Sequence, residues 1–349
     1  MQITRINTDT QETVIRVEDA ATALTGFIAV HSTQLGPAAG GLRMRPYASE
    51  ADALEDVLRL SDGMTYKNAA AGLPLGGGKA VIIGDPANQK SRALLRVFAR
   101  AIDTLKGAYI TAEDMGMSPA DMATIAGVTP HVAGLAEGPF ASGDPSPITA
   151  RGIFNAIRTA WAHETGNAGL KHVHVAVQGL GHVGWHLCAL LHEAGAALTV
   201  TDIDAARIAK AETAFGAHPE TLEGIYSAEA DIFAPCAIGG ILNENTIPQL
   251  KVRVVAGGAN NQLQSAADGA RLQALGILYA PDFVANGGGI INVATEILKI
   301  KDREGFVDDK LAALDQTMKM ILNQARAADI SPDAAAIATV RNLMARPAA

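Results

Sequence analysis

The sequence contains little cysteine and few aromatic side chains. Only two of its 349 residues are cysteines, Cys188 and Cys236, and neither belongs to a CxxC pair. Disulfides and structural zinc are therefore not expected, and the pair His172 and His174 lacks the third ligand that would predict a metal site. Aromatic residues make up 4% of the chain, so its cores must be built from Ala, Val, Ile and Leu.

The chain also lacks long apolar runs and an excess of basic charge. No stretch of about 18 apolar residues is present, and residues 1–10 lack the apolar core of a signal peptide. The formal net charge of −8 argues against nucleic acid or an anionic membrane as the main partner. We therefore expect a cytoplasmic protein with a small-molecule partner and, at this length, two domains.

What the sequence does contain is a glycine-rich stretch, Met64–Val81, with two lysines and no other charged residue. Burying an ammonium group is costly unless it is paired or loses its proton. Lys67 and Lys79 in this setting therefore predict a cleft that binds an anion and shifts a protonation equilibrium. Two solvated lysines beside a glycine-rich turn are the alternative.

Other residues near this stretch are candidates for the same site. Lys79 is expected at the point where the glycine loop enters a buried strand, which would hold it rigidly. Asp114 ends an expected strand at 109–116, where its carboxylate could move protons close to the lysines; a solvated loop acid is the alternative. Gly40 and Gly41 would let a ligand or another backbone approach closely, although a bulge or turn is the simpler interpretation.

The most informative motif in the second half of the chain is the run Gly179, Leu180, Gly181, His182, Val183, Gly184. It follows an expected strand at 171–178 and opens an expected helix at 185–194. The first two glycines allow a tight turn and close approach to a pyrophosphate, and the third allows helix and strand to pack. The full strand–turn–helix–strand context predicts a dinucleotide site, against the alternative of a structural unit with chance glycines.

The next expected strand, at 197–201, ends at Asp202, which lies 23 residues after the first glycine. A carboxylate there would accept hydrogen bonds from the ribose hydroxyls and repel a 2′-phosphate. Because no Arg or Lys occurs from 203 to 206, the sequence favours NAD over NADP.

Further strands expected at 230–235, 252–256 and 277–280 predict a doubly wound α/β sheet, which binds ligands at the carboxyl ends of its strands. Cys236, Ala237 and Asn260 fall at such ends. We interpret Cys236 as a small buried side chain rather than a nucleophile, since no His is placed to activate it. A second glycine run, 286–289, opens a helix on which Ile290 and Val293 share a face, either for core packing or as a pocket wall.

Turn-forming residues at 142–147 mark a domain boundary. We expect an α/β substrate-binding and oligomerisation domain at 1–142 and a Rossmann-type NAD-binding domain at 143–325, with a cleft between them. The C-terminal helices at 326–349 are expected to pack back on the first domain.

Five separated segments resemble, in order, the superfamily of glutamate, leucine, phenylalanine and valine dehydrogenases, and in particular its leucine/valine/phenylalanine branch. These segments are 35–41, 64–70, 76–80, 111–114 and 258–263. The resemblance implies a homo-oligomeric enzyme that carries out reversible, NAD-dependent oxidative deamination of an L-amino acid to a 2-oxo acid and ammonia. It is specific for the family and less specific for the substrate.

The resemblance also implies roles for individual residues. Lys67 would bind the substrate carboxylate, Lys79 would act as general base, and Asp114 would assist proton transfer. Two ammonium groups in one apolar cleft oppose each other's charge, so Lys79 is expected to give up its proton while Lys67 stays charged. The other implied contacts are with the substrate for Gly40, Gly41 and Asn260, and with the cofactor for Asn260 and, at the nicotinamide carboxamide, Thr149. Cys236 and Ala237 are expected at the cofactor from their place at the strand ends.

The same motifs imply that Ala39, Ala112, Ile290 and Val293 line the pocket for the substrate side chain. All four are apolar, and none is a Lys or Ser that would pair with a γ-carboxylate, so glutamate is disfavoured. Ala39 stands where leucine-specific enzymes carry a larger aliphatic residue. This difference would widen the pocket toward phenylalanine or tryptophan unless Leu42 compensates for it.

Two alternative functions make different demands on the sequence. An NAD-linked oxidoreductase acting on a hydroxy acid would need a site centred on His or Arg in place of the two lysines. A cofactor-binding protein without catalytic activity would be expected to lack Lys67, Lys79 or Asp114, and all three are present.

Overall fold

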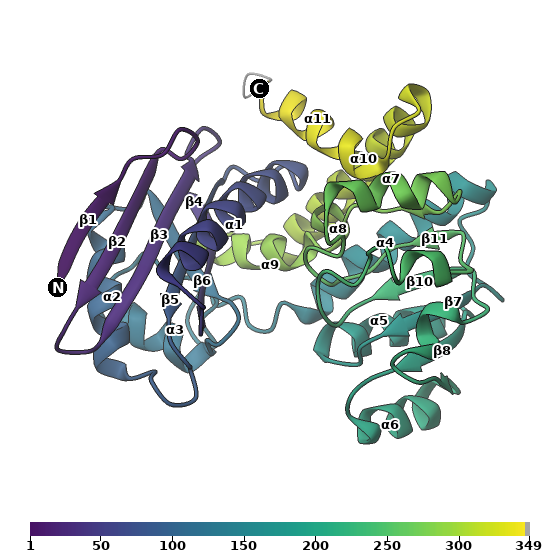
Figure 1. Ribbon diagram of the computed structural model, residues 1–349, viewed down its shortest axis with the longest axis horizontal. Coiled ribbons are helices and arrows are strands. Elements are labelled where there is room, and N and C mark those ends of the chain that lie inside the picture. The colour runs from purple at the N-terminus through teal and green to yellow at the C-terminus, as the bar shows by residue number, and fades with distance from the viewer. Residues whose placement is uncertain (346–349) are drawn as a thin grey trace. The chain divides into compact units, whose positions relative to one another are not determined.

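The computed structural model describes residues 1–345, which form two compact units. Unit 1 comprises Met1–Asp144 and Asn292–Phe306; unit 2 comprises Pro145–Ile291 and the chain from Val307 onward. The chain therefore leaves one unit for the other three times: after Asp144, within helix α9 (Gly288–Ile297) and within helix α10 (Arg303–Ala328) (Figure 1). The prediction of two α/β domains is confirmed.

Unit 1 is built on a six-stranded mixed sheet. Its strand order is β1-β2-β3-β5-β4-β6, antiparallel from β1 to β5 and parallel from β5 through β4 to β6. The strands are β1 (Gln2–Ile6), β2 (Thr13–Asp19), β3 (Leu24–Ser32), β4 (Ala38–Arg45), β5 (Gly76–Ile83) and β6 (Tyr109–Glu113). Its helices are α1 (Glu50–Ala70), α2 (Arg92–Thr104) and α3 (Pro119–Ala126).

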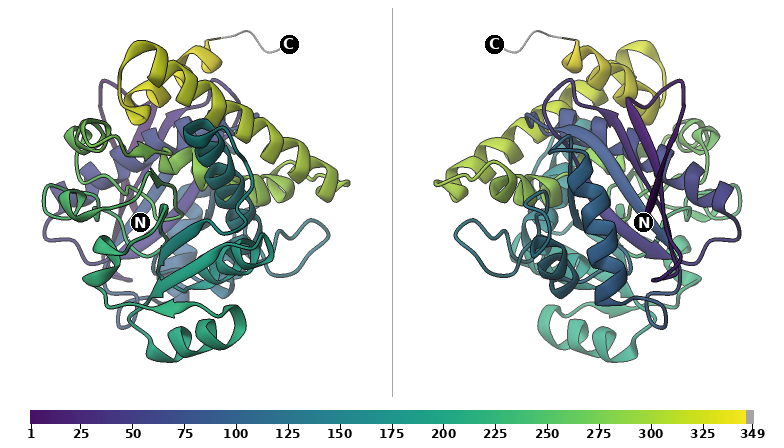
Figure 2. Two further views of the ribbon diagram at one scale, coloured as in Figure 1. Left: turned by 90° about the vertical axis from the view of Figure 1, so that its right-hand side faces the viewer. Right: turned by 90° about the vertical axis from the view of Figure 1, so that its left-hand side faces the viewer.

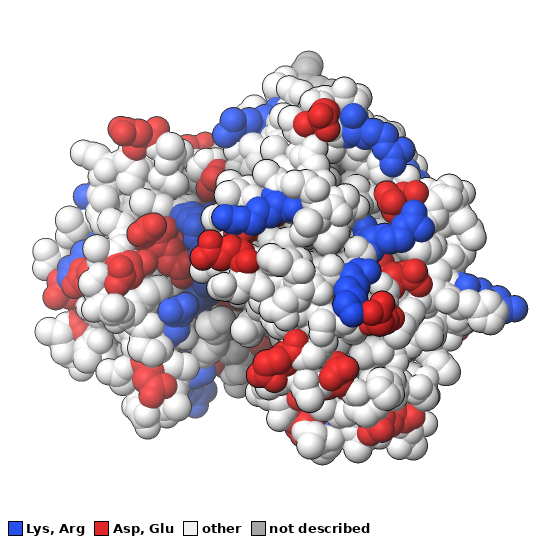
Figure 3. Space-filling view, turned by 45° about the vertical axis from the view of Figure 1, so that its right-hand side comes forward, with Lys and Arg blue, Asp and Glu red and all other residues white. Residues whose placement is uncertain are grey.

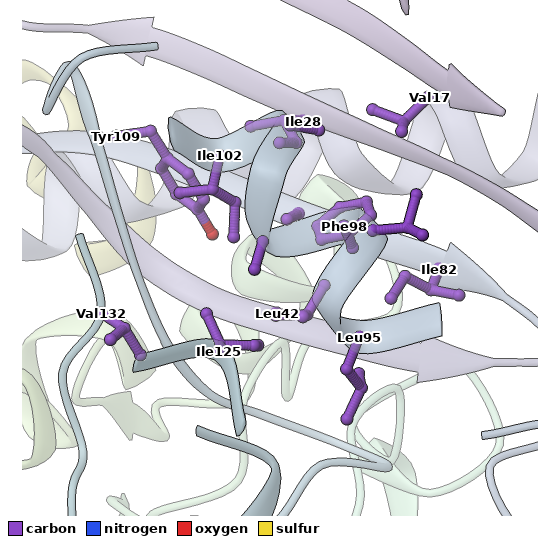
Figure 4. Close-up of a cluster of buried hydrophobic side chains, with 14 of the residues drawn as sticks. Val17, Ile28, Leu42, Ile82, Leu95, Phe98, Ile102, Tyr109, Ile125 and Val132 are labelled. Carbon is purple, nitrogen blue, oxygen red and sulfur yellow. The ribbon is translucent and has the colours of Figure 1, made fainter. Parts of the chain in front are cut away.

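Successive side chains of a strand point to opposite faces, so this sheet packs into two hydrophobic cores, one on each face. On β3, Phe27 and Ala29 join Ala53 and Val57 of α1, whereas Ile28 and Val30 join the larger core under α2. Figure 4 shows this larger core, with Leu95, Phe98 and Ile102 reaching from α2 toward the strands. Figure 2, right, shows the same helix lying against the purple strands.

Glycines bring β5 and its neighbours together more closely than other residues could. A Cβ on Gly77 would lie 2.1 Å from the backbone nitrogen of Thr65 in α1, and one on Gly78 would lie 2.7 Å from the ring of Tyr109 in β6. The three glycines before Lys79 therefore belong to strand β5 itself. The prediction of a loop that enters the sheet at Lys79 is wrong, as is the simpler turn interpretation of Gly40 and Gly41, which lie within β4.

Unit 2 is built on a parallel sheet in the order β12-β11-β10-β7-β8-β9, which confirms the predicted Rossmann-type domain. Its strands are β7 (His174–Gln178), β8 (Ala197–Thr201), β9 (His218–Pro219), β10 (Ile232–Pro235), β11 (Val254–Val255) and β12 (Leu278–Tyr279). Its helices are α4 (Ser146–Thr165), α5 (His182–Glu193), α6 (Ala205–Phe215), α7 (Ala266–Ala274) and α8 (Asp282–Ala285), with 3₁₀ turns at Gly224–Ser227 and Ile247–Gln249.

The C-terminal helices do not pack as expected. Helix α11 (Pro332–Met344) lies against α7 and β12 of unit 2, where Ala335, Ala336 and Val340 are fully buried. Its apolar periodicity predicts a buried face but does not say which surface covers that face. The expectation that 326–349 returns to the first domain is therefore corrected for α11, while residues 346–349 lie outside the described part. Residues 292–306, expected in the second domain, belong to unit 1.

A hydrogen-bond network in unit 1 fixes the chain just before it leaves for unit 2. The buried carboxylate of Glu296 in α9 accepts from the backbone N–H of Gly134 at 2.9 Å and of Leu135 at 3.3 Å. It also accepts from the backbone N–H and the hydroxyl of Ser142, at 3.0 and 2.8 Å. The carbonyl of Ser142 in turn accepts from Asn292 at 3.1 Å and from Arg303. One carboxylate thus ties α9 to the segment that precedes the first crossing.

We expect Glu296→Gln to lower the stability of the protein by roughly 1–3 kcal/mol, because an amide cannot accept all of these hydrogen bonds and brings donors of its own. Thermal unfolding followed by circular dichroism measures the effect. Glu304→Gln, an exposed change in the first turn of α10, is the control and should stay within about 0.5 kcal/mol of the parent. Equal melting temperatures for all three proteins would contradict the assigned role of Glu296.

Candidate active site

The centre of the candidate site in unit 1 is a buried ion pair. Lys79 on β5 is 7% exposed, and its Nζ lies 2.5 Å from Oδ2 of Asp114. Asp114 comes directly after β6, which lies beside β4 and is separated from β5 only by that strand. Nε of Arg43, on β4, approaches the same carboxylate oxygen at 3.3 Å. The structure therefore brings Lys79 and Asp114 together, as the sequence predicts, and adds Arg43.

The two cations determine the protonation state of Asp114. Burial by itself would raise the pKa of the Asp114 carboxyl, but the nearby charges of Lys79 and Arg43 hold that pKa well below its ordinary value. The group is therefore a carboxylate at any neutral or alkaline pH. It can accept a hydrogen bond from an ammonium group and stabilise it, whereas it carries no proton to give.

The predicted substrate-side glycines pack against the protein itself. A Cβ on Gly40 would lie 1.8 Å from the carbonyl oxygen of Gly78, and one on Gly41 would lie 2.7 Å from Cβ of Asp114. These glycines are expected from the sequence to let either a ligand or another backbone approach closely. The structure shows the close approach of neighbouring backbone. It is this closeness of β4 to β5 and to the end of β6 that assembles the ion pair.

The remaining predicted residues of unit 1 lie on elements next to this pair. Lys67 is half-buried in the last turn of α1, the helix that packs on β5. Ala39 on β4 is fully buried, and Ala112 on β6, opposite Gly41 in register, is 8% exposed. Neither alanine presents much surface in this unit, so their contact with a substrate stays a prediction.

The dinucleotide motif of unit 2 forms the turn between β7 and α5. Each of its three glycines has a different structural role. Gly179 has a φ of +97°, which favours glycine. A Cβ on Gly184 would lie 2.0 Å from the carbonyl oxygen of Gly179, so this residue allows α5 to pack on the turn. Gly181 is the N-cap of α5 and has open space where a Cβ would stand. That space, at a helix N-terminus without a capping side chain, fits a pyrophosphate group.

Asp202, at the end of β8, accepts a hydrogen bond from the turn between β7 and α5. Its Oδ2 accepts from the backbone N–H of Leu180 at 2.6 Å, and its Oδ1 accepts from that of Asp204 at 2.9 Å. A carboxylate oxygen has two lone pairs, so each can still accept from a ribose hydroxyl. Arg207 stands beside it, with Nη1 3.8 Å from Oδ1 of Asp202. Arg207 directly follows residues 203–206, whose lack of Lys and Arg favours NAD.

The other predicted residues of unit 2 lie near the carboxyl ends of its strands or beside α9. The backbone N–H of Cys236 donates to the carbonyl of Gln178 at 2.7 Å. Burial raises the pKa of the Cys236 thiol to about 11, which argues against a nucleophile. Thr149 in α4 donates its hydroxyl to the carbonyl of Pro145 at 2.9 Å. Ala237 packs against Gly179.

Asn260 has a partner that the sequence interpretation missed. Asn286, 5% exposed, donates from Nδ2 to Oδ1 of Asn260 at 2.8 Å, and its own Oδ1 has no hydrogen-bond partner within residues 1–345. The glycines that follow it pack on α4: a Cβ on Gly288 would lie 2.2 Å from the carbonyl oxygen of Ile148. The second glycine run thus serves helix packing. Ile290 and Val293 are on α9, the first in unit 2 and the second in unit 1.

Two family descriptions match the chain. Residues 8–131 match the dimerisation domain of Glu/Leu/Phe/Val dehydrogenase, and residues 204–346 match the glutamate/leucine/phenylalanine/valine dehydrogenase family. A leucine dehydrogenase of Geobacillus stearothermophilus is 52% identical over 286 residues, which cover 82% of this chain and 78% of the relative. A phenylalanine dehydrogenase of Caldalkalibacillus thermarum is 46% identical over 82% of this chain and 79% of its own length.

A solved structure is similar over nearly the whole chain. The crystal structure of L-tryptophan dehydrogenase from Nostoc punctiforme has a TM-score of 0.83 and 40% sequence identity, and the match covers 96% of both chains.

We expect Gly181→Ala to fold normally but to bind NADH at least about 10-fold more weakly, because the added methyl group meets no protein atom and occupies space next to the α5 N-terminus. Fluorescence titration with NADH measures the affinity, and thermal unfolding checks the fold. Gly63→Ala, another glycine with open space, lies in α1 and should leave binding unchanged. Unchanged affinity in Gly181→Ala would mean that this turn does not hold the dinucleotide.

Proposed function

The chain belongs to the Glu/Leu/Phe/Val dehydrogenase family, and on this premise we propose that it catalyses the reversible, NAD-dependent oxidative deamination of an apolar L-amino acid to the 2-oxo acid and ammonia. The observation that carries this proposal is the buried pair of Lys79 and Asp114. Paired in this way, a lysine is held rigidly where it can exchange protons with a substrate.

Each residue has a proposed task. Lys67 binds the α-carboxylate of the amino acid as a point charge. A dinucleotide, when bound, would supply the hydride acceptor for Cα. The amino group releases one proton to solvent before it is oxidised to the imine. Lys79 then takes a proton from the water that adds to the imine carbon and returns it to the nitrogen, so that ammonia leaves as the carbonyl group forms. Asp114 stays ionised throughout and stabilises the ammonium form of Lys79.

The apolar residues proposed for the side-chain pocket support an aliphatic or aromatic substrate. Ala39, Ala112, Ile290 and Val293 offer no partner for a second carboxylate. Leu42 does not fill the space left by the small Ala39, because it lies an odd number of residues away on β4 and packs into the core under α2. We therefore propose that phenylalanine or tryptophan is accepted as well as leucine.

NAD is the proposed cofactor, held by Leu180, His182, Val183 and the three motif glycines, with Cys236, Ala237, Thr149 and Asn260 toward the nicotinamide end. The carboxylate of Asp202 supports NAD over NADP, since it would repel a 2′-phosphate. Arg207 acts in the opposite direction, because it could pair with that phosphate.

We also propose a homo-oligomer in the cytoplasm. Unit 1 matches a family described as a dimerisation domain, and both cysteines are free, as is usual in reducing compartments. Within residues 1–345, no helix is long and apolar enough to span a membrane. On the face drawn in Figure 3, basic side chains are interspersed with acidic ones rather than gathered in a patch that would suit a polyanion.

The reaction is tested by NADH formation at alkaline pH from a panel of leucine, valine, phenylalanine, tryptophan and glutamate, with 2-hydroxy acids as a comparison. We expect turnover with the apolar amino acids, and expect Lys79→Met to lower kcat by at least about 100-fold while NADH binding is retained. Lys90→Met removes another lysine paired with an aspartate in unit 1 and should stay active. Turnover of a hydroxy acid alone, or normal turnover in Lys79→Met, would overturn the proposal.

The cofactor preference is tested by comparing kcat/KM for NAD and NADP. We expect Asp202→Asn to narrow the ratio by at least about 10-fold, equivalent to about 1.4 kcal/mol, because the like-charge repulsion is removed. In the double variant Asp202→Asn/Arg207→Ala, kcat/KM for NADP relative to NAD should fall again in part, because the cation that could pair with the 2′-phosphate is removed. A parent enzyme that prefers NADP would contradict the assignment.

A further inference from the structure

Arg43 is a buried cation for which the proposed reaction has no direct use. It lies on β4 two residues after Gly41 and is 9% exposed. Because successive side chains of a strand alternate, Arg43 shares the face of Gly41, where an added Cβ would lie 2.7 Å from Cβ of Asp114. The backbone continues the same alignment, since the N–H of Met44 donates to the carbonyl of Met115 at 2.9 Å. The side chain of Arg43 is thereby directed along the strand pair toward the carboxylate of Asp114.

The guanidinium group joins two carboxylates. Its Nε lies 3.3 Å from Asp114 Oδ2, and its Nη1 lies 3.1 Å from Asp56 Oδ2 on α1. Asp56 is itself held by the hydroxyl of Tyr47 at 2.8 Å and by Arg59 at 2.9 Å. Arg43 is therefore clamped on its far side and presents a fixed positive charge to Asp114 on its near side.

We propose, on the basis of the proposed function, that Arg43 is a positioning residue, which keeps the Asp114 carboxylate ionised and directed at Lys79. The partial burial of Asp114 favours such a second cation. The Asp114 carboxylate has lost most of its contact with water. Lys79 gains and loses a proton during the proposed reaction, so by itself it would not give Asp114 a constant positive neighbour. Arginine does not lose its proton in proteins, so it supplies a charge that does not change during the reaction.

Lysine could not replace Arg43 fully. The planar guanidinium contacts Asp56 and Asp114 through two different nitrogens at once, whereas an ammonium group offers one nitrogen at the end of a flexible stem. Arg43→Lys therefore keeps the charge but loses the fixed geometry, and Arg43→Met keeps much of the bulk but loses the charge. The two variants separate the two contributions.

The titratable groups around Asp114 come from three strands and one helix. Lys79 faces it from β5 and Arg43 from β4, while Tyr109 and Glu113 lie near it on β6 and Asp56 of α1 lies behind Arg43. Removing a positive charge from this set makes every neighbouring group bind its proton more tightly. The acid limb of the pH profile of kcat should therefore move to higher pH when Arg43 loses its charge.

The experiment measures kcat and KM against pH for the parent, Arg43→Met, Arg43→Lys and the control Arg59→Met, with the best amino acid of the panel. We expect kcat of Arg43→Met to fall by roughly 10- to 100-fold with its acid limb displaced to higher pH, and the KM for NAD to change less than about 3-fold. Arg43→Lys should recover the position of the acid limb and only part of kcat. Arg59 also pairs with Asp56 but is 55% exposed, so Arg59→Met should behave as the parent.

The outcomes distinguish this inference from the proposed function. An inactive parent enzyme would refute the proposed function itself. With an active parent, an Arg43→Met enzyme that melts earlier but keeps the parent's pH profile and kcat per folded molecule would show that Arg43 only stabilises the fold and would overturn the inference. If Arg43→Met does not fold, the inference rests on Arg43→Lys, which must lose kcat without a shift of its acid limb; full activity in that variant would overturn it.

Discussion

The ion pair between Lys79 and Asp114 is the interaction on which the rest of unit 1 depends. Both groups are largely removed from water, and an isolated buried charge is expensive. The structure meets this cost with a row of alternating charges: Lys79, Asp114, Arg43, Asp56 and Arg59. Each member lies beside a partner of opposite sign, and the last one is exposed to solvent. The row connects β5, β4 and α1, so the chemistry of Lys79 is tied to the packing of the whole sheet.

Glycine makes this arrangement possible. Gly40 and Gly41 on β4 and Gly77 and Gly78 on β5 all stand where a Cβ would overlap a neighbouring atom. Glycine weakens a strand, because it gives up more conformational freedom and has no side chain to pack. This lower strand stability accompanies the close packing of α1 and β6 against β4 and β5. In the stretch Met64–Val81, Gly76, Gly77 and Gly78 are thus strand residues that allow compact packing around the charged groups, rather than an open loop.

The dinucleotide turn of unit 2 follows a different logic with the same residue type. Gly179 is required by its backbone conformation and Gly184 by helix packing, whereas Gly181 leaves space that no protein atom fills. Asp202 accepts a hydrogen bond from the backbone of the turn and so helps to hold the shape of the turn. A motif that the sequence shows as one unit therefore separates, in three dimensions, into positions that build the turn and one position that is open to a ligand.

The sequence by itself determined the two-domain α/β architecture and the dinucleotide turn, because these depend on local periodicity and on motifs with fixed spacing. Its resemblance to the family indicated that Lys79 and Asp114 share one site. Tertiary structure alone decided what those residues contact. Arg43 and Asn286 are unremarkable in the sequence, since a strand arginine and a loop asparagine are usually solvated. Their contacts arise only because β4 lies beside β6, and because the loop after β11 lies beside the end of α8. Likewise, the sequence predicted that α11 has an apolar face, but not that this face packs on α7. Apolar periodicity indicates that a helix face is buried without indicating which element covers it.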